Sequence, residues 1–142
     1  MKYKIFVDGG AGTTGLEIVE RLKKRDDVSL ITLSEENRKS DSARKEALNS
    51  ADLVFLCLPD DAAVSAVSMI ENPSVKVIDA STAHRTKGGW VYGFPEINGL
   101  EKEIKKSKRV ANPGCHASGF NALIAPLIGE NLLSKNANLT CF

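Results

Sequence analysis

The chain has 142 residues and a formal net charge of +1, because 19 lysines and arginines stand against 18 aspartates and glutamates. This length is enough for one domain with its own core, and the near balance of charge argues against a nucleic-acid or membrane-surface partner. Three cysteines at wide spacings, outside any zinc pattern, argue against disulfides and a metal and favour a reducing compartment. With no signal peptide and no apolar run of about 18 residues, we expect a cytoplasmic protein.

Apolar runs of strand length alternate along the chain with segments of helical period. We expect strands at residues 3–8, 28–33, 52–58, 75–79 and 109–112. We expect helices at 13–25, 41–49, 60–70 and 96–106, with another beginning near Cys115. This order predicts an α/β fold, a Rossmann-like doubly wound parallel sheet with helices on both faces. The carboxyl ends of its strands then share one edge of the sheet.

The first strand runs directly into a glycine-rich turn, residues 9–15. The turn fits both Gly10-x-Gly12-x-x-Gly15 and Gly9-x-x-Gly12-x-x-Gly15, and it opens a helix. Glycine lets the backbone approach a pyrophosphate, and free N–H groups at the helix start point at its charge. The alternative is a plain glycine turn without a ligand. The residues that we expect to contact a dinucleotide here are Gly9, Gly12, Thr13, Thr14 and Gly15.

The end of the second strand bears on the choice between NAD and NADP. A carboxylate there would bind the ribose hydroxyls of NAD, whereas a 2′-phosphate needs cations and hydroxyls. The strand ends in Ser34, with Arg38 and Lys39 shortly after it, which favours NADP(H). Glu35 and Glu36 lie close by and leave NAD preference open.

The later strands bring Pro59, Ser81 and the segment 112–115 to the same edge, where we expect Pro59 and Ser81 to contact the cofactor. Within that segment, Cys115 follows Pro113-Gly114 and begins a helix, where free N–H groups stabilise a thiolate. Cys115 is therefore the candidate nucleophile. Cys57 lies inside an apolar strand, and we interpret it as a small core residue.

Four stretches together resemble a known family. They are Gly12-Thr13-Thr14-Gly15, Asp79-Ala80-Ser81-Thr82-Ala83-His84-Arg85, Tyr92-Gly93-Phe94-Pro95-Glu96 and Asn112-Pro113-Gly114-Cys115. The set is similar to the short type of N-acetyl-gamma-glutamyl-phosphate reductase, in the aspartate-semialdehyde dehydrogenase superfamily. A lysine-pathway reductase of an aminoadipyl phosphate has a very similar cysteine signature and stays an alternative, as does an aspartyl-phosphate reductase.

The resemblance implies an arginine-biosynthesis enzyme that uses NADPH to reduce N-acetyl-gamma-glutamyl phosphate to the semialdehyde, with release of inorganic phosphate. Cys115 would form a thioester with the acyl group. Arg85 and Asn112 would bind the substrate's phosphate, and Ser81 would lie near the nicotinamide. For Arg85 the alternative is an ion pair that braces its loop. A stand-alone NADP-binding redox sensor, in which Cys115 is modified rather than catalytic, is the competing function.

Two features depart from the family. The residue after the cysteine is often tyrosine but here is His116, and neighbours on a helix do not face each other, so we do not expect it to activate Cys115. His84, in a loop, is likewise not expected to be a direct catalyst. The family also continues into an α+β domain that supplies the substrate pocket, an acid/base histidine and most of a homo-oligomer interface. We therefore expect residues 1–137 to be the NADP-binding domain, residues 138–142 to begin the second domain, and the isolated chain to be inactive.

Overall fold

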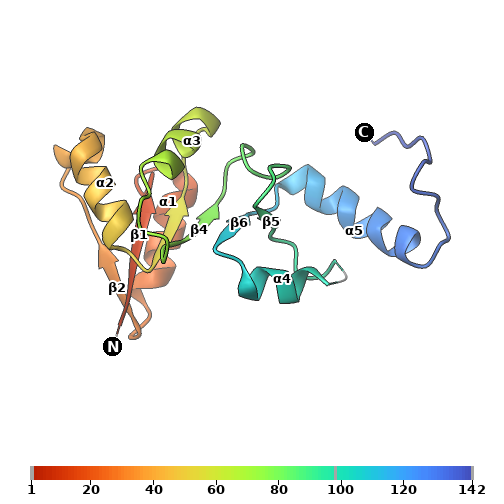
Figure 1. Ribbon diagram of the computed structural model, residues 1–142, viewed down its shortest axis with the longest axis horizontal. Helices are drawn as coiled ribbons and strands as arrows, with labels where there is room; N and C mark the ends of the chain where they lie inside the picture. Colours follow the sequence, from red (N-terminus) through yellow and green to blue (C-terminus); the bar gives the residue numbers. More distant parts are fainter. Residues whose placement is uncertain (1, 98, 142) are drawn as a thin grey trace.

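The computed structural model describes residues 2–97 and 99–141 and confirms the α/β class (Figure 1). Its sheet has six strands in the order β2-β1-β3-β4-β6-β5, and every pair is parallel. The strands are β1 Tyr3–Asp8, β2 Val28–Ile31, β3 Leu53–Leu56, β4 Lys76–Asp79, β5 Val91–Tyr92 and β6 Arg109–Ala111. The helices are α1 Thr13–Lys23, the 3-10 turn η1 Asn37–Lys39, α2 Asp41–Ser50, α3 Asp60–Ser68, α4 Leu100–Lys106 and α5 Cys115–Gly129.

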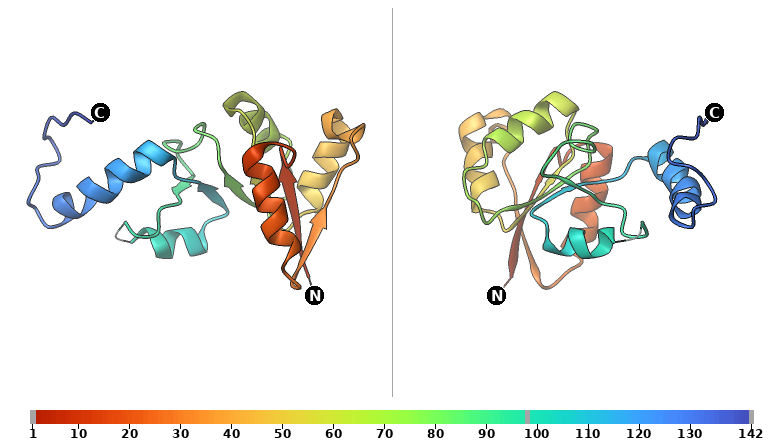
Figure 2. Two further views of the ribbon diagram at one scale, coloured as in Figure 1. Left: turned by 180° about the vertical axis from the view of Figure 1, so that it is seen from behind. Right: turned by 45° about the vertical axis from the view of Figure 1, so that its right-hand side comes forward.

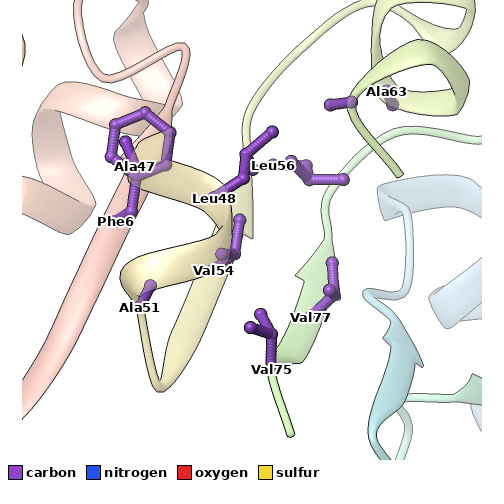
Figure 3. Close-up of a cluster of buried hydrophobic side chains, with 10 residues drawn as sticks. Phe6, Ala47, Leu48, Ala51, Val54, Leu56, Ala63, Val75 and Val77 are labelled. Carbon is purple, nitrogen blue, oxygen red and sulfur yellow. The ribbon is translucent and has the colours of Figure 1, made fainter. Parts of the chain in front are cut away.

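The main core lies between the sheet and helices α2 and α3 (Figure 3). The strand register sets Phe6, Val54 and Val77 side by side on this face. Leu48 on α2 and Ala63 on α3 cover them, and both are fully buried. Because strand side chains alternate, the neighbours of Phe6 in β1 point to the other face, where α1 lies (Figure 2). Helices thus cover both faces of this part of the sheet.

Several element boundaries differ from the expectation, most of them by one or two residues, and one strand was not expected. β2 ends at Ile31 rather than at residue 33, and α4 begins at Leu100 rather than at residue 96. Gly99 precedes α4 with a φ of 85°, a left-handed conformation that starts the helix late. The two-residue strand β5 was not predicted, because two residues show no periodicity.

Helix α5 begins at Cys115 as predicted, but it does not cover the sheet. It extends away from β5 and β6 (Figures 1 and 2), and none of its residues is buried. Leu123 on this helix is 72% exposed. Within residues 2–97 and 99–141, no helix has the length and apolar character needed to cross a membrane.

Candidate cofactor and thiol site

The strand register brings the chemically interesting loops to one edge of the sheet. Asp8, Leu56, Asp79 and Ala111, the last residues of β1, β3, β4 and β6, lie in one row across the sheet. The glycine turn, Cys57, the loop from Ala80 and the segment from Asn112 each follow one of these residues directly. Segments up to a hundred residues apart in sequence are therefore neighbours at this edge.

The glycine turn closes tightly between β1 and α1. Gly9 has a φ of 82°, and a Cβ there would also collide with the carbonyl oxygen of Cys57. A Cβ at Gly15 would collide with the carbonyl oxygen of Gly9 and lie 2.7 Å from Cα of Gly10. Gly12, the residue before α1, makes no side-chain cap, so the first N–H groups of the helix have no such partner. Helix starts of this kind bind phosphate groups.

A cavity of about 820 Å³ opens beside this turn. Besides backbone of the turn and apolar residues of β2, three cations line it: Arg38, Lys39 and Arg44. Asp8 is the one carboxylate among the described lining residues, and Arg44 neutralises it through Nη2 at 2.8 Å and Nε at 3.3 Å from Oδ2. This contact raises the pKa of Arg44, so the guanidinium stays charged. Glu35 pairs with Arg38 at 3.2 Å and lies outside the cavity lining.

A smaller cavity of about 280 Å³ lies on the other side of the turn, against residues 12–15, Cys57 and Ala80. Burial raises the pKa of the Cys57 thiol, and the carboxylates of Asp79 and Asp8 add to that shift. The raised pKa makes Cys57 a weaker nucleophile than an ordinary thiol. It lies one residue past β3 and is half-buried against this cavity, so it is not the core residue inside a strand that the sequence suggested.

The loop that follows β4 is fastened by buried polar contacts. Asp79 and His84 are both fully buried, with Nδ1 of His84 at 2.6 Å from Oδ2 of Asp79. Ser81 donates to the same carboxylate through its backbone N–H at 2.9 Å and its hydroxyl at 2.6 Å. Farther along, Thr82 donates to Asp60 of α3 through its N–H and its hydroxyl, and these bonds lower the pKa of Asp60. The hydroxyl of Ser81 therefore already donates its hydrogen bond within the protein.

Arg85 leaves this loop and reaches the start of α5. Its Nε donates to the carbonyl oxygen of Asn112 at 3.2 Å. Its guanidinium lies directly against Gly114, where a Cβ would collide with Nη1. The side-chain amide of Asn112 donates to the carbonyl oxygen of Pro113 at 3.2 Å. A planar cation is therefore placed beside the first turn of a helix, an arrangement suited to an anion.

Cys115 is the first residue of α5 and is exposed to solvent. Its Sγ lies 3.5 Å from Nδ1 of His116, although sequence reasoning did not expect the two to face each other. Both side chains are exposed, and no preceding helical turn crowds them, so the imidazole can turn back over the thiol. The pair can exchange a proton directly. Ser118 donates to the carbonyl oxygen of Gly114 and completes the first turn.

Three predicted cofactor residues, Ser34, Pro59 and Ser81, lie outside the linings of both cavities. Ser34 accepts backbone bonds from Asn37 and Arg38, both at 3.1 Å, and Pro59 precedes α3 and accepts from Ala63 at 2.9 Å. The sequence did not identify Arg44 as a residue lining the larger cavity, because no local pattern indicates its ion pair with Asp8, which lies far from it in the chain.

Comparison with known proteins gives concordant results. Residues 4–107 match the family described as semialdehyde dehydrogenase, NAD binding domain. The chain is 50% identical over 140 residues to an N-acetyl-gamma-glutamyl-phosphate reductase of Trichormus variabilis, covering 98% of this chain and 44% of that protein. It is 55% identical over 130 residues to N-acetyl-gamma-glutamyl-phosphate reductase 2 of Pseudomonas putida, covering 91% of this chain and 42% of that one. The chain thus spans less than half the length of these relatives.

Solved structures agree on the fold. The aspartate semialdehyde dehydrogenase of Francisella tularensis superposes with a TM-score of 0.67 at 17% identity, over 91% of this chain and 41% of that one. The enzyme of Candida albicans, determined with NADP, superposes with a TM-score of 0.61 at 17% identity, over 90% of this chain and 47% of that one. At this identity the likeness shows the fold alone.

Proposed function

Since the chain belongs to the semialdehyde dehydrogenase family through its NAD-binding domain, we propose that it is the cofactor-binding and thiol-bearing part of an N-acetyl-gamma-glutamyl-phosphate reductase. The observation that carries the proposal is the shared edge, where the glycine turn, Arg85 and Cys115 follow the carboxyl ends of β1, β4 and β6. Identity of 50% to named reductases over nearly the whole chain supports this substrate over an aspartyl or aminoadipyl phosphate.

The glycine turn and the larger cavity fit a dinucleotide. The close approach at Gly9 and Gly15, which a Cβ would block, leaves backbone N–H groups open to a pyrophosphate. Bound there, NADPH supplies the hydride that reduces the acyl group. Arg38 and Lys39 favour a 2′-phosphate, since the carboxylate of Asp8 is already neutralised by Arg44. We therefore propose NADP rather than NAD as the preferred cofactor.

In the proposed reaction the Cys115 thiolate attacks the acyl carbon, so that a C–S bond forms as the bond to the phosphate oxygen breaks. Inorganic phosphate leaves toward the guanidinium of Arg85, which donates through its planar fork. After reduction of the thioester, the C–S bond breaks, the semialdehyde leaves and the thiol returns. The 3.5 Å contact between Cys115 and His116 supports His116 as the acceptor of the thiol proton.

We also propose the wider organisation of the enzyme. Residues 1–137 form the cofactor-binding unit, and residues 138–142 begin a second unit that corresponds to the remaining length of the relatives. That second unit completes the substrate pocket and supplies most of a homo-oligomer interface in a cytoplasmic enzyme. The greater length of both reductases supports this division.

The test is phosphate-dependent reduction of NADP by N-acetylglutamate semialdehyde. This chain is fused to the remaining segment of the Trichormus variabilis relative, and the fusion is compared with its Cys115→Ser and His116→Gln variants. We expect activity that Cys115→Ser abolishes and His116→Gln lowers about tenfold or more, with a clear preference for NADP over NAD. Equal or higher rates with aspartate semialdehyde would overturn the proposed substrate, and full activity of Cys115→Ser would overturn the mechanism.

A further inference from the structure

The proposed mechanism makes no use of His84, the most deeply buried of the chain's two histidines. It is 0% exposed, its ring stacks on Trp90 with centroids 4.1 Å apart, and Nδ1 contacts Asp79. Taking an imidazole and a carboxylate out of water costs free energy unless they bond to each other. A loop that contains such a pair therefore gains a defined conformation from it.

The bonding at Asp79 sets how the ring is held. A carboxylate only accepts, so Nδ1 of His84 carries a hydrogen and donates to Oδ2, which also accepts from the hydroxyl of Ser81. Nε2 of His84 is buried and has no hydrogen-bond partner within the described chain. One hydrogen bond and one stacked face therefore orient the ring, and its Nε2 exchanges no proton with any described group.

The same loop is tied down on both sides of His84. Thr82 bonds to Asp60 of α3, the N–H of Arg85 donates to the carbonyl oxygen of Thr82 at 3.3 Å, and that of Lys87 donates to His84 at 3.2 Å. Arg85 follows the buried histidine immediately, so its backbone cannot shift without moving His84. The guanidinium of Arg85 then spans to Asn112 and Gly114.

We infer that His84 is a positioning residue, which holds the guanidinium of Arg85 against Gly114, the residue before Cys115 at the start of α5, through its bond to Asp79 and its stack on Trp90. This inference rests on the proposed function in one respect, namely that Arg85 binds an anion. Its other premises are the contacts of the loop itself. His84 acts through Arg85 and does not touch the reacting atoms.

The test compares how fast Cys115 reacts with anionic iodoacetate and with neutral iodoacetamide, followed by peptide mass spectrometry. The ratio of the two rates reports the cation near the thiol and cancels changes in the reactivity of the thiol itself. We expect Arg85→Gln to lower this ratio about 3–10-fold, the size of one partly screened charge. We expect His84→Leu to lower it similarly and His84→Asn, whose amide can replace Nδ1 as donor to Asp79, to restore most of it. Lys105→Gln, on exposed α4, is the control and leaves the ratio unchanged.

A second perturbation is independent of the folding of the His84 variants. Trp90 is only half-buried, so Trp90→Leu removes the stack while His84 and its partner Asp79 stay in place, and we expect the ratio to fall about twofold or more. Trp90→Phe keeps an aromatic face and the wild-type ratio. If Arg85→Gln lowers the ratio while folded His84→Leu and Trp90→Leu both keep it, the positioning role is overturned. An unchanged ratio in Arg85→Gln overturns instead the anion-binding role of Arg85 in the proposed function, and the inference with it.

Discussion

Replacement of Gly15 by alanine tests the claim that α1 must lie directly on the glycine turn. A Cβ at this third residue of the helix would collide with the carbonyl oxygen of Gly9 and lie 2.7 Å from Cα of Gly10 and 2.9 Å from the carbonyl carbon of Gly9. All three neighbours are backbone atoms, which cannot move aside by changing rotamer. The helix or the turn must therefore shift.

Two opposing terms set the size of the effect. Alanine favours a helix interior over glycine by about 1 kcal/mol, and less in the first turn. Overpacking costs about 1–3 kcal/mol, with a backbone obstacle at the upper end of that range. For Gly15→Ala we expect a net loss of about 2 kcal/mol in the free energy of unfolding, or about thirtyfold in the folding equilibrium. The shifted turn should also weaken NADP binding about tenfold or more.

Gly119→Ala is the matched control, because Gly119 also lies inside a helix but a Cβ there meets nothing within 4 Å. Here only the greater helix propensity of alanine acts, so we expect the free energy of unfolding to rise by about 0.5–1 kcal/mol and the NADP affinity to stay unchanged. Urea unfolding followed by circular dichroism and NADP titration by calorimetry measure both quantities. Wild-type stability and NADP affinity in Gly15→Ala would refute the close-packing argument.

Three further outcomes are expected. Because burial raises the pKa of Cys57, alkylation of the reduced chain at mildly alkaline pH should modify Cys115 before Cys57, and peptide mapping that gives the reverse order would contradict the assignment. Bonds from Thr82 lower the pKa of Asp60 in the folded state, so they stabilise the fold above the pKa of the unfolded chain and stop doing so as pH falls through the folded pKa. On acidification the wild type should therefore lose more unfolding free energy than Asp60→Asn in urea titrations. Equal losses in the two proteins would count against the bond. Leu48 is fully buried, so Leu48→Ala should cost about 2–5 kcal/mol in thermal unfolding, and a cost below about 1 kcal/mol would show that the core can collapse around the cavity.

The sequence was sufficient to predict the sheet and the shared edge, because both depend on local patterns. Apolar runs that alternate with segments of helical period predict parallel strands. Glycine and proline mark the turn at residues 9–15 and the segment 112–115. Once the strands are parallel, their carboxyl ends must meet, so the neighbourhood of these segments follows without coordinates.

The remaining features depend on contacts that no local pattern encodes. The ion pair of Asp8 and Arg44 joins residues 36 apart, and the bond of Asp79 to His84 depends on the path of a loop. The contact of Cys115 with His116 depends on rotamers at a helix start, where sequence spacing is a poor guide. The path of α5 is also invisible in its sequence, since its apolar residues are typical of a helix packed on a sheet.

The stack of Trp90 on His84 gives the protein an intrinsic optical probe. Trp90 is the only tryptophan of the chain, so its fluorescence reports on its stack with His84 in the loop that carries Arg85, and on the edge of the core on which it packs. Emission should change when the loop moves, and energy transfer from Trp90 to bound NADPH would follow cofactor binding at the same edge. Rapid-mixing fluorescence can therefore time the order of loop movement and cofactor binding without an added label.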